Sequence, residues 1–269
     1  VTYMLPIGPG ARREYSNDYE DFTCCHGTGM ENHVRYSEHI YHMGEDGGLY
    51  IQLYLSSSFR WEQKGVTLTQ TADFPAFESV FTIDRAARLK LYFRIPYWCR
   101  DSFSLSVNGV QQTLRYAADN TDSGISDSGI SDSDISDAAV SDGDISPEDT
   151  FCGVDSMTDK CGGYAVLERD FAAGDKITVQ LPHRLHLCYT PDSYEAMPAA
   201  SLMYGPFVMT ALASGTEWIT LSLPPEPEAA FVMAEENGMP VLWYDNLKFV
   251  PMYAAHNTPY HTYFKINLL

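Results

Sequence analysis

The stretch that decides the fold is residues 89–95, which read Leu-Lys-Leu-Tyr-Phe-Arg-Ile. Apolar side chains at every second position predict a strand with one buried face and one solvated face. Residues 49–55, 66–69 and 102–107 alternate in the same way, and residues 177–181 do so after a Gly-Asp turn. Short alternating strands at this spacing favour an antiparallel sandwich.

The strand pattern continues toward the C-terminus. Asn108-Gly109 is a hairpin signal within the first set of strands. From about residue 185 the pattern restarts after a break, which indicates a second, smaller sandwich. Further strands are expected at residues 202–211, 218–223, 241–244 and 260–266. The predicted fold class is therefore mainly β, with tandem antiparallel β-sandwich domains over residues 41–184 and 185–269.

An acidic repeat interrupts the first of these domains. Between Asp119 and Lys160 there are twelve acidic residues and one basic residue, which accounts for −11 of the formal net charge of −19. From Ser123 the sequence repeats every five residues with one aliphatic side chain per repeat. Such a segment cannot offset the entropy lost on ordering, so we expect a disordered insert at about 118–160. Cys152 and Cys161 could pair across the short loop between them or both be free thiols.

The stretch that carries chemistry is residues 22–33, Phe-Thr-Cys-Cys-His-Gly-Thr-Gly-Met-Glu-Asn-His. Residues 28–31 fit a capping box, which predicts a helix over about 28–42. Cys24 and Cys25 would then precede a helix N-terminus, where free N–H groups and the helix dipole favour ionised thiols. Two adjacent thiolates can reach one zinc ion, which needs two more ligands. The alternative is that both are small buried hydrophobes.

Neighbouring side chains have simpler interpretations. His26 could be a third ligand, but a surface histidine beside a turn is favoured. We expect His33, His39 and His42 on the solvated side of the helix, Glu31 as a capping residue, and Arg35 paired with Glu31 or Glu38. Tyr97 and Trp98 could stack on a sugar, although closing the end of a sandwich core is the commoner role.

The run Cys-Cys-x-Gly-Thr-Gly-Met-Glu-Asn-His resembles the signature of the β-L-arabinofuranosidases of glycoside hydrolase family 127 and its relative, family 146. Segments similar to that family follow in order along nearly the whole chain except the acidic repeat. They include residues 48–54, 66–75, 93–98, 107–109, 163–169, 204–206 and 260–264.

The resemblance implies a fold and a site. Family members have an (α/α)6 catalytic barrel followed by β-sandwich domains, so residues 1–40 would be the end of that barrel, with the Cys-Cys motif. Cys24 would be the nucleophile, and Cys24 and Cys25 would both bind zinc. The resemblance places the other two zinc ligands, a Glu and a Cys, and the acid/base Glu upstream of Val1.

The implied activity is a retaining hydrolysis of terminal β-L-arabinofuranosyl residues through a covalent glycosyl thioether. We expect this chain to be a fragment that is inactive alone. The alternative is a non-catalytic β-sandwich accessory module that packs on a catalytic domain or binds glycans, and would present a solvent-facing aromatic platform. A third possibility is that the metal is structural and that Cys24 and Cys25 carry out no chemistry.

Composition restricts the partners. The formal net charge of −19 argues against nucleic acid and anionic membrane surfaces. No run of about 18 apolar residues exists, so no membrane span is expected. The expected partner is a carbohydrate, such as an arabinofuranoside or a plant cell-wall glycan. The compartment, cytoplasmic or exported, is left open, because free thiols suit a reducing interior whereas the family also includes exported members. The oligomeric state cannot be read from the sequence.

Overall fold

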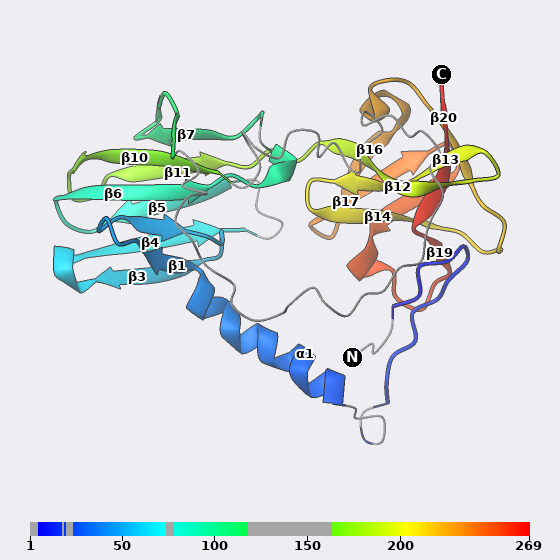
Figure 1. Cartoon of the computed structure of the whole chain (residues 1–269), viewed down its shortest axis with the longest axis horizontal. Coiled ribbons are helices and arrows are strands. Elements are labelled where there is room, and N and C mark those ends of the chain that lie inside the picture. Colours follow the sequence, from blue (N-terminus) through cyan, green and yellow to red (C-terminus); the bar gives the residue numbers. More distant parts are fainter. Residues whose placement is uncertain (1–4, 18, 20–23, 74–77, 100, 118–162) are drawn as a thin grey trace, which may run out of the picture.

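The computed structural model describes residues 5–17, 19, 24–73, 78–99, 101–117 and 163–269. Within these residues the chain forms two β units and one α-helix (Figure 1). The predicted mainly β fold class is confirmed, whereas the barrel remnant remains a prediction. The acidic repeat, the Cys152–Cys161 pair and nearly all of the expected segment 1–5 lie outside the described residues.

The first β unit consists of two sheets, with strand orders β1-β2-β6-β10-β9 and β3-β4-β5-β11-β7-β8. The pairings within both sheets are antiparallel, except that β2 runs parallel to β6. The strands of the first sheet are β1 (Tyr41–Met43), β2 (Leu49–Ile51), β6 (Ala87–Arg94), β9 (Arg115–Tyr116) and β10 (Tyr164–Phe171). Those of the second are β3 (Ser57–Trp61), β4 (Val66–Ala72), β5 (Glu78–Ile83), β7 (Ser104–Val107), β8 (Val110–Gln111) and β11 (Lys176–Gln180).

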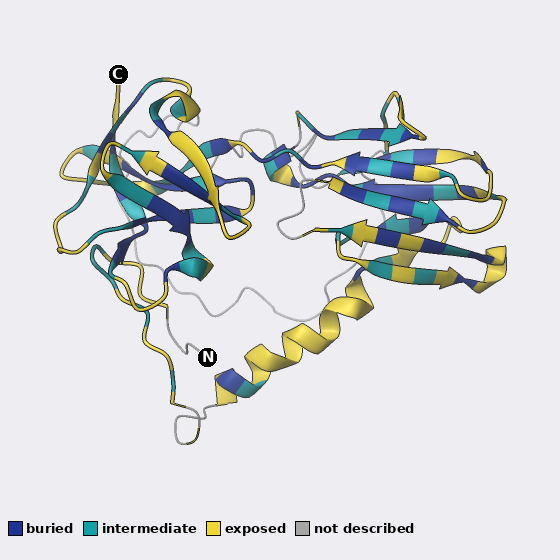
Figure 2. Ribbon diagram, turned by 180° about the vertical axis from the view of Figure 1, so that it is seen from behind, coloured by how far each residue is buried: buried dark blue, intermediate teal, exposed yellow. Residues whose placement is uncertain are grey.

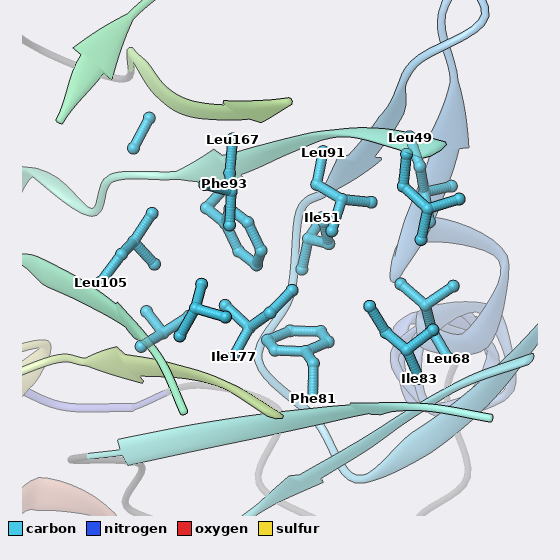
Figure 3. Packing of buried hydrophobic residues seen from close by; sticks show 14 of the residues in the cluster. Leu49, Ile51, Leu68, Phe81, Ile83, Leu91, Phe93, Leu105, Leu167 and Ile177 are labelled. Atoms are coloured by element: carbon cyan, nitrogen blue, oxygen red, sulfur yellow. The ribbon is translucent and has the colours of Figure 1, made fainter. Parts of the chain in front are cut away.

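The alternating strands bury their apolar faces between these two sheets. Leu91 and Phe93 on β6 meet Phe81 on β5 and Ile177 on β11, and all four are fully buried (Figure 3). The rings of Phe81 and Phe93 make an edge-on contact with centroids 5.4 Å apart. Burying large side chains at this packing density supplies most of the stability of such a unit.

The predicted hairpin at residues 108–109 is confirmed. Val107 pairs with Val110, so Asn108 and Gly109 form a two-residue turn with φ angles of 50° and 80°. Asparagine and glycine adopt this left-handed backbone at low cost, which explains why the pair predicts the turn.

The second β unit is one continuous nine-stranded sheet. Its main path runs β15-β20-β13-β14-β18-β17-β16, with β12 paired to β13 and β19 to β14. The larger of its two core clusters draws buried side chains from β12 to β15, β17, β18 and β20, so the sheet must curl around it. The strands are β12 (Leu185–Tyr194), β13 (Met197–Tyr204), β14 (Phe207–Leu212), β15 (Thr220–Leu223), β16 (Val232–Glu236), β17 (Met239–Tyr244), β18 (Leu247–Pro251), β19 (Tyr260–His261) and β20 (Tyr263–Leu268).

The single strand expected at 202–211 is wrong in one respect. The chain turns at Gly205, whose φ is +54°, and the segment becomes the hairpin of β13 and β14. A run of apolar residues masked this turn, because both strands bury side chains in the same core.

The N-terminal segment lies against the second β unit rather than the first. Ala11 forms a bridge with Tyr260, and the Tyr260 hydroxyl donates to the carbonyl of Pro6. Arg13 donates from Nη2 to the carbonyl of Met252 over 2.6 Å. The chain then returns through α1 (Cys24–Arg35) and the short 3-10 helix η1 (Tyr36–His39) to β1 of the first unit (Figure 1).

Helix α1 is largely uncovered. His26 is its one buried residue, whereas the apolar side chains of Met30 and Val34 are 48% and 73% exposed (Figure 2). Among the described residues, no helix is long and apolar enough to span a membrane.

Candidate functional site

The thiol pair stands at the N-terminus of α1. Cys24 and Cys25 are the first two residues of this helix, and both are exposed. Their sulfur atoms lie 3.8 Å apart, too far for a bond between them. The first four N–H groups of a helix lack partners within it, and the helix dipole places partial positive charge there. Both thiols therefore lie where a helix favours negative charge.

The predicted capping box is wrong. The helix starts at Cys24, four residues before Thr28, and the Thr28 hydroxyl donates to the Cys24 carbonyl over 3.1 Å. Thr28 is thus inside the helix, where its hydroxyl bonds one turn back. Glu31 accordingly has no capping position. The helix also ends earlier than predicted, because residues 41–43 pair with β2.

The histidines divide into two groups. His26 is 5% exposed, which contradicts the expectation of a surface residue. His33, His39 and His42 are exposed as predicted. His39 and His42 bring their rings within 5.6 Å of each other at the junction of η1 and β1. Among the described residues, no group of three or more His, Cys, Asp or Glu side chains is placed to hold a metal ion.

The sulfur separation itself fits a shared metal ion. Two sulfur ligands about 2.3 Å from a tetrahedral zinc ion lie about 3.8 Å apart. The Cys24 and Cys25 sulfurs are 3.8 Å apart without any rearrangement. The pair therefore suits two of the four positions of a tetrahedral thiolate site. Cys24 and Cys25 are the side chains that could hold such an ion.

The other candidates are divided between the core and the surface. Trp98 packs against the core of the first unit, as the commoner interpretation predicts, whereas Tyr97 is 58% exposed. Arg35 makes no ion pair with Glu31 or Glu38, and all three are exposed in the described structure.

The remaining described thiols differ from the pair on α1. Cys99 is 1% exposed, and burial raises its pKa to about 12, so it is a poor nucleophile. Cys188 on β12 is disulfide-bonded. No sequence pattern singled out Cys188, because its position in a partly apolar strand gives no signal of a bond.

A second cluster was also missed by the sequence analysis. Tyr194, near the end of β12, and Trp218, before β15, stack with ring centroids 4.4 Å apart and an interplanar angle of 16°. No short motif links the two, because 24 positions separate them. They come together because β20 pairs with β13 on one side and with β15 on the other.

Comparisons with known proteins agree with the sequence motifs. Residues 48–122 match the sequence model of a family described as "Beta-L-arabinofuranosidase, GH127 middle domain". The resemblance to glycoside hydrolase family 127 is therefore confirmed for this part of the chain. No curated protein matches the chain.

Solved structures share the fold across nearly the whole chain. A GH127 β-L-arabinofuranosidase from Geobacillus stearothermophilus is 17% identical with a TM-score of 0.60, and the alignment covers 96% of this chain and 39% of that one. A glycoside hydrolase is 16% identical (TM-score 0.62, 95% and 41% covered). A GH127 β-arabinofuranosidase is also 16% identical (TM-score 0.60, 97% and 40% covered). The chain thus spans about two fifths of the length of these structures.

Proposed function

We propose that this chain, which carries a GH127 middle domain in residues 48–122, is part of a retaining glycoside hydrolase that releases terminal β-L-arabinofuranosyl residues. Cys24 is the proposed nucleophile, and Cys24 and Cys25 are proposed zinc ligands. The observation that carries the proposal is the pair of exposed sulfur atoms, 3.8 Å apart, at the N-terminus of a helix. The match to the middle-domain family supports the substrate class.

The exposure of α1 supports the proposal that this helix packs against another domain of the parent protein. A 12-residue helix that contains two glycines is marginal in water without tertiary packing. Met30 and Val34 leave apolar surface on this helix in solvent. We expect this surface to pack against a helical catalytic domain of the parent protein. Residues 1–40 would make this contact if they form the end of the catalytic barrel. Such packing would also bring further ligands and an acid to the thiol pair.

The chemistry follows the retaining scheme with sulfur in place of the usual carboxylate. Bound zinc would keep the two thiols deprotonated at neutral pH. The Cys24 thiolate attacks the anomeric carbon, so that a C–S bond forms while the C–O bond to the leaving group breaks. A separate acid in the parent protein protonates the departing oxygen. The same residue, now a base, takes a proton from water as the water oxygen attacks this carbon, the C–S bond breaks, and the thiolate and the acid are both restored.

The test uses the parent protein, because its acid and its other ligands are part of the site. Cys24→Ser should lower turnover of p-nitrophenyl β-L-arabinofuranoside by at least about a thousandfold, since an alcohol is a far weaker nucleophile. Circular dichroism should show an unchanged fold. Cys99→Ser serves as the thiol control and should keep most of the activity. Hydrolysis by Cys24→Ser near the wild-type rate would reject the nucleophile assignment.

A non-catalytic accessory module is the alternative. The stacked rings of Tyr194 and Trp218 favour it, because an aromatic platform is the feature expected of a glycan-binding module. Both proposals hold if one polypeptide carries a catalytic domain and a glycan-binding surface. A purely structural metal is the remaining reading, and zinc-dependent protection of Cys24 without any effect of Cys24→Ser on turnover would support it.

A further inference from the structure

We propose that Tyr194 and Trp218 form a surface site on the second β unit that binds a neutral sugar ring of a glycan. The choice of a sugar rests on the proposed function, whereas the site itself rests on the geometry of four side chains. These are Tyr194 on β12, Glu195 in the turn that follows, Trp218 in the loop before β15, and Lys265 on β20.

The two rings form a stacked aromatic surface. The Tyr194 and Trp218 rings face each other and are nearly parallel, with an interplanar angle of 16° and centroids 4.4 Å apart. Tyr194 is 40% exposed, and Trp218 is partly exposed. Large aromatic side chains in a pair are rigid and lose little conformational entropy when a ligand binds. The pair therefore offers a prepared apolar surface to the C–H groups of a sugar.

An ion pair adjoins the rings and supplies polar groups. The Lys265 ammonium lies 4.9 Å from the centroid of the Tyr194 ring and donates to the Glu195 carboxylate. Lys265 is only 13% exposed, whereas Glu195 is 67% exposed. The carboxylate thus keeps oxygen atoms available to hydroxyl donors, while the lysine fixes its position.

The turn that presents Glu195 is held in an unfavourable conformation. Tyr194 pairs with Met197, so Glu195 and Ala196 are the two turn residues, with φ angles of 51° and 59°. Left-handed backbone costs a residue other than glycine roughly 1–2 kcal/mol. The equivalent turns at residues 108–109 and 237–238 both have the sequence Asn-Gly. Among the described two-residue turns in which both φ angles are positive, this one alone lacks asparagine and glycine, and such strain beside stacked rings points to a local function.

The charges select the class of ligand. Glu195 and Lys265 compensate each other, so the site carries no net charge. The chain as a whole has a formal net charge of −19, which repels polyanions such as nucleic acids and polyuronates. Stacking surfaces for nucleic acid bases lie in positively charged grooves, unlike this one. A neutral polyol can pack its C–H groups on the rings and donate hydrogen bonds from its hydroxyl groups to the exposed carboxylate.

The second β unit also contains a similar cluster of side chains that can serve as a control for the proposed site. Trp243 on β17 is 36% exposed, lies 5.7 Å from Lys248, and Lys248 pairs with Glu236. This second cluster has the tryptophan, the lysine and the glutamate, but among the described residues no aromatic side chain stacks on Trp243. It separates the effect of a stacked pair from that of an exposed tryptophan.

The test measures retardation of the 269-residue chain in native gels that contain soluble arabinoxylan, with dextran gels as the reference. The wild type should be retarded by arabinoxylan more than by dextran. Trp218→Ala and Tyr194→Ala should each weaken the apparent affinity about tenfold, the loss expected for one aromatic contact. Trp243→Ala should bind as the wild type does. Trp218→Phe keeps an aromatic ring, so it should retain binding while the ligand-induced change in tryptophan fluorescence disappears.

Several outcomes would overturn the site. They are the absence of retardation of the wild type by arabinoxylan, equal weakening by Trp243→Ala and Trp218→Ala, or loss of binding in Trp218→Phe with its fold intact. If an alanine variant fails to fold, the Trp218→Phe fluorescence measurement still decides. If the parent protein hydrolyses the arabinofuranoside but arabinoxylan does not retard the chain, only the Tyr194–Trp218 site is rejected. If arabinoxylan retards the chain but Cys24→Ser keeps full activity, only the assignment of Cys24 as nucleophile is rejected.

Discussion

The imidazole ring of His183 meets the indole ring of Trp98 edge-on, with centroids 4.7 Å apart. Trp98 borders the core of the first β unit, and His183 lies in the connection to β12 of the second. His183 also makes edge-on contacts with Tyr204 and Phe207, at 5.5 and 5.6 Å. Such contacts contribute about 0.5–1.5 kcal/mol each. One histidine therefore joins aromatic side chains of both units.

Gly205→Ala should destabilise this joint. A Cβ at Gly205 would lie 2.7 Å from two atoms of the His183 ring and 3.0 Å from its Cβ, and the φ of Gly205 is +54°. We expect a loss of about 2–4 kcal/mol in the free energy of unfolding, measured with urea, from strain and clash together. Gly238→Ala is the control, because its φ is +75° and nothing lies within 4 Å. It should lose only about 1 kcal/mol. Equal losses in the two variants would contradict the role of His183.

Ala196→Gly should stabilise the chain. Ala196 has a φ of 59°, and glycine relieves this strain at a smaller cost in the entropy of the unfolded chain. The net gain in the free energy of unfolding should be about 0.5–1 kcal/mol. The reverse change, Gly109→Ala, replaces a glycine with a φ of 80° in an equivalent turn and should destabilise. Thermal melts should show a higher melting temperature for Ala196→Gly and a lower one for Gly109→Ala. A lower melting temperature for Ala196→Gly would contradict the claim that Ala196 is strained.

Asp46→Asn should alter the acid sensitivity of the first unit. Hydrogen bonds from Lys90 and Tyr92 lower the pKa of the Asp46 carboxyl from 3.8 to about 2. Because the folded pKa is the lower one, the stabilisation is present above about pH 4 and is lost as the pH falls toward 2. Asp46 is partly exposed, so we expect a contribution of about 1 kcal/mol. Urea titrations from pH 6 to pH 2 should show the gap between wild type and variant closing over this window. A constant gap would show that Asp46 does not titrate in this way.

Alkylation should distinguish the described thiols. Iodoacetamide should label the exposed Cys24 quickly and the buried Cys99 slowly, as read by mass spectrometry of the peptides. Zinc should slow the labelling of Cys24, and Cys25→Ser should remove most of that protection, because one sulfur ligand is lost. Labelling of Cys24 that zinc leaves unchanged, in the parent protein, would count against a shared metal ion.

Local patterns sufficed for much of the β structure. The strands that hold Leu91, Phe93 and Ile177 were predicted because a half-buried strand has a period of two residues. The Asn108-Gly109 turn was predicted because its two residues prefer left-handed backbone. The thiol pair was visible for the same reason, since its two cysteines are adjacent in the chain.

The predicted start of α1 was wrong because the same residue types, at the same spacing, occur both in capping boxes and inside helices. Thr28 and Glu31 have the right spacing for a cap, yet Thr28 bonds one turn back to Cys24. The burial of His26 was also missed, because burial depends on contacts outside its own segment. For the same reason, no pattern predicted that residues 5–13 would lie against β19.

The mainly β fold class, the Asn-Gly turn at 108–109 and the adjacency of Cys24 and Cys25 could all be predicted from local sequence, because each is a property of neighbouring residues. Which distant side chains meet depends on the packed fold. His183 reaches Trp98 across 85 positions, and Tyr194 reaches Trp218 across 24. Such contacts follow from strand pairing and sheet curvature, which local spacing does not encode.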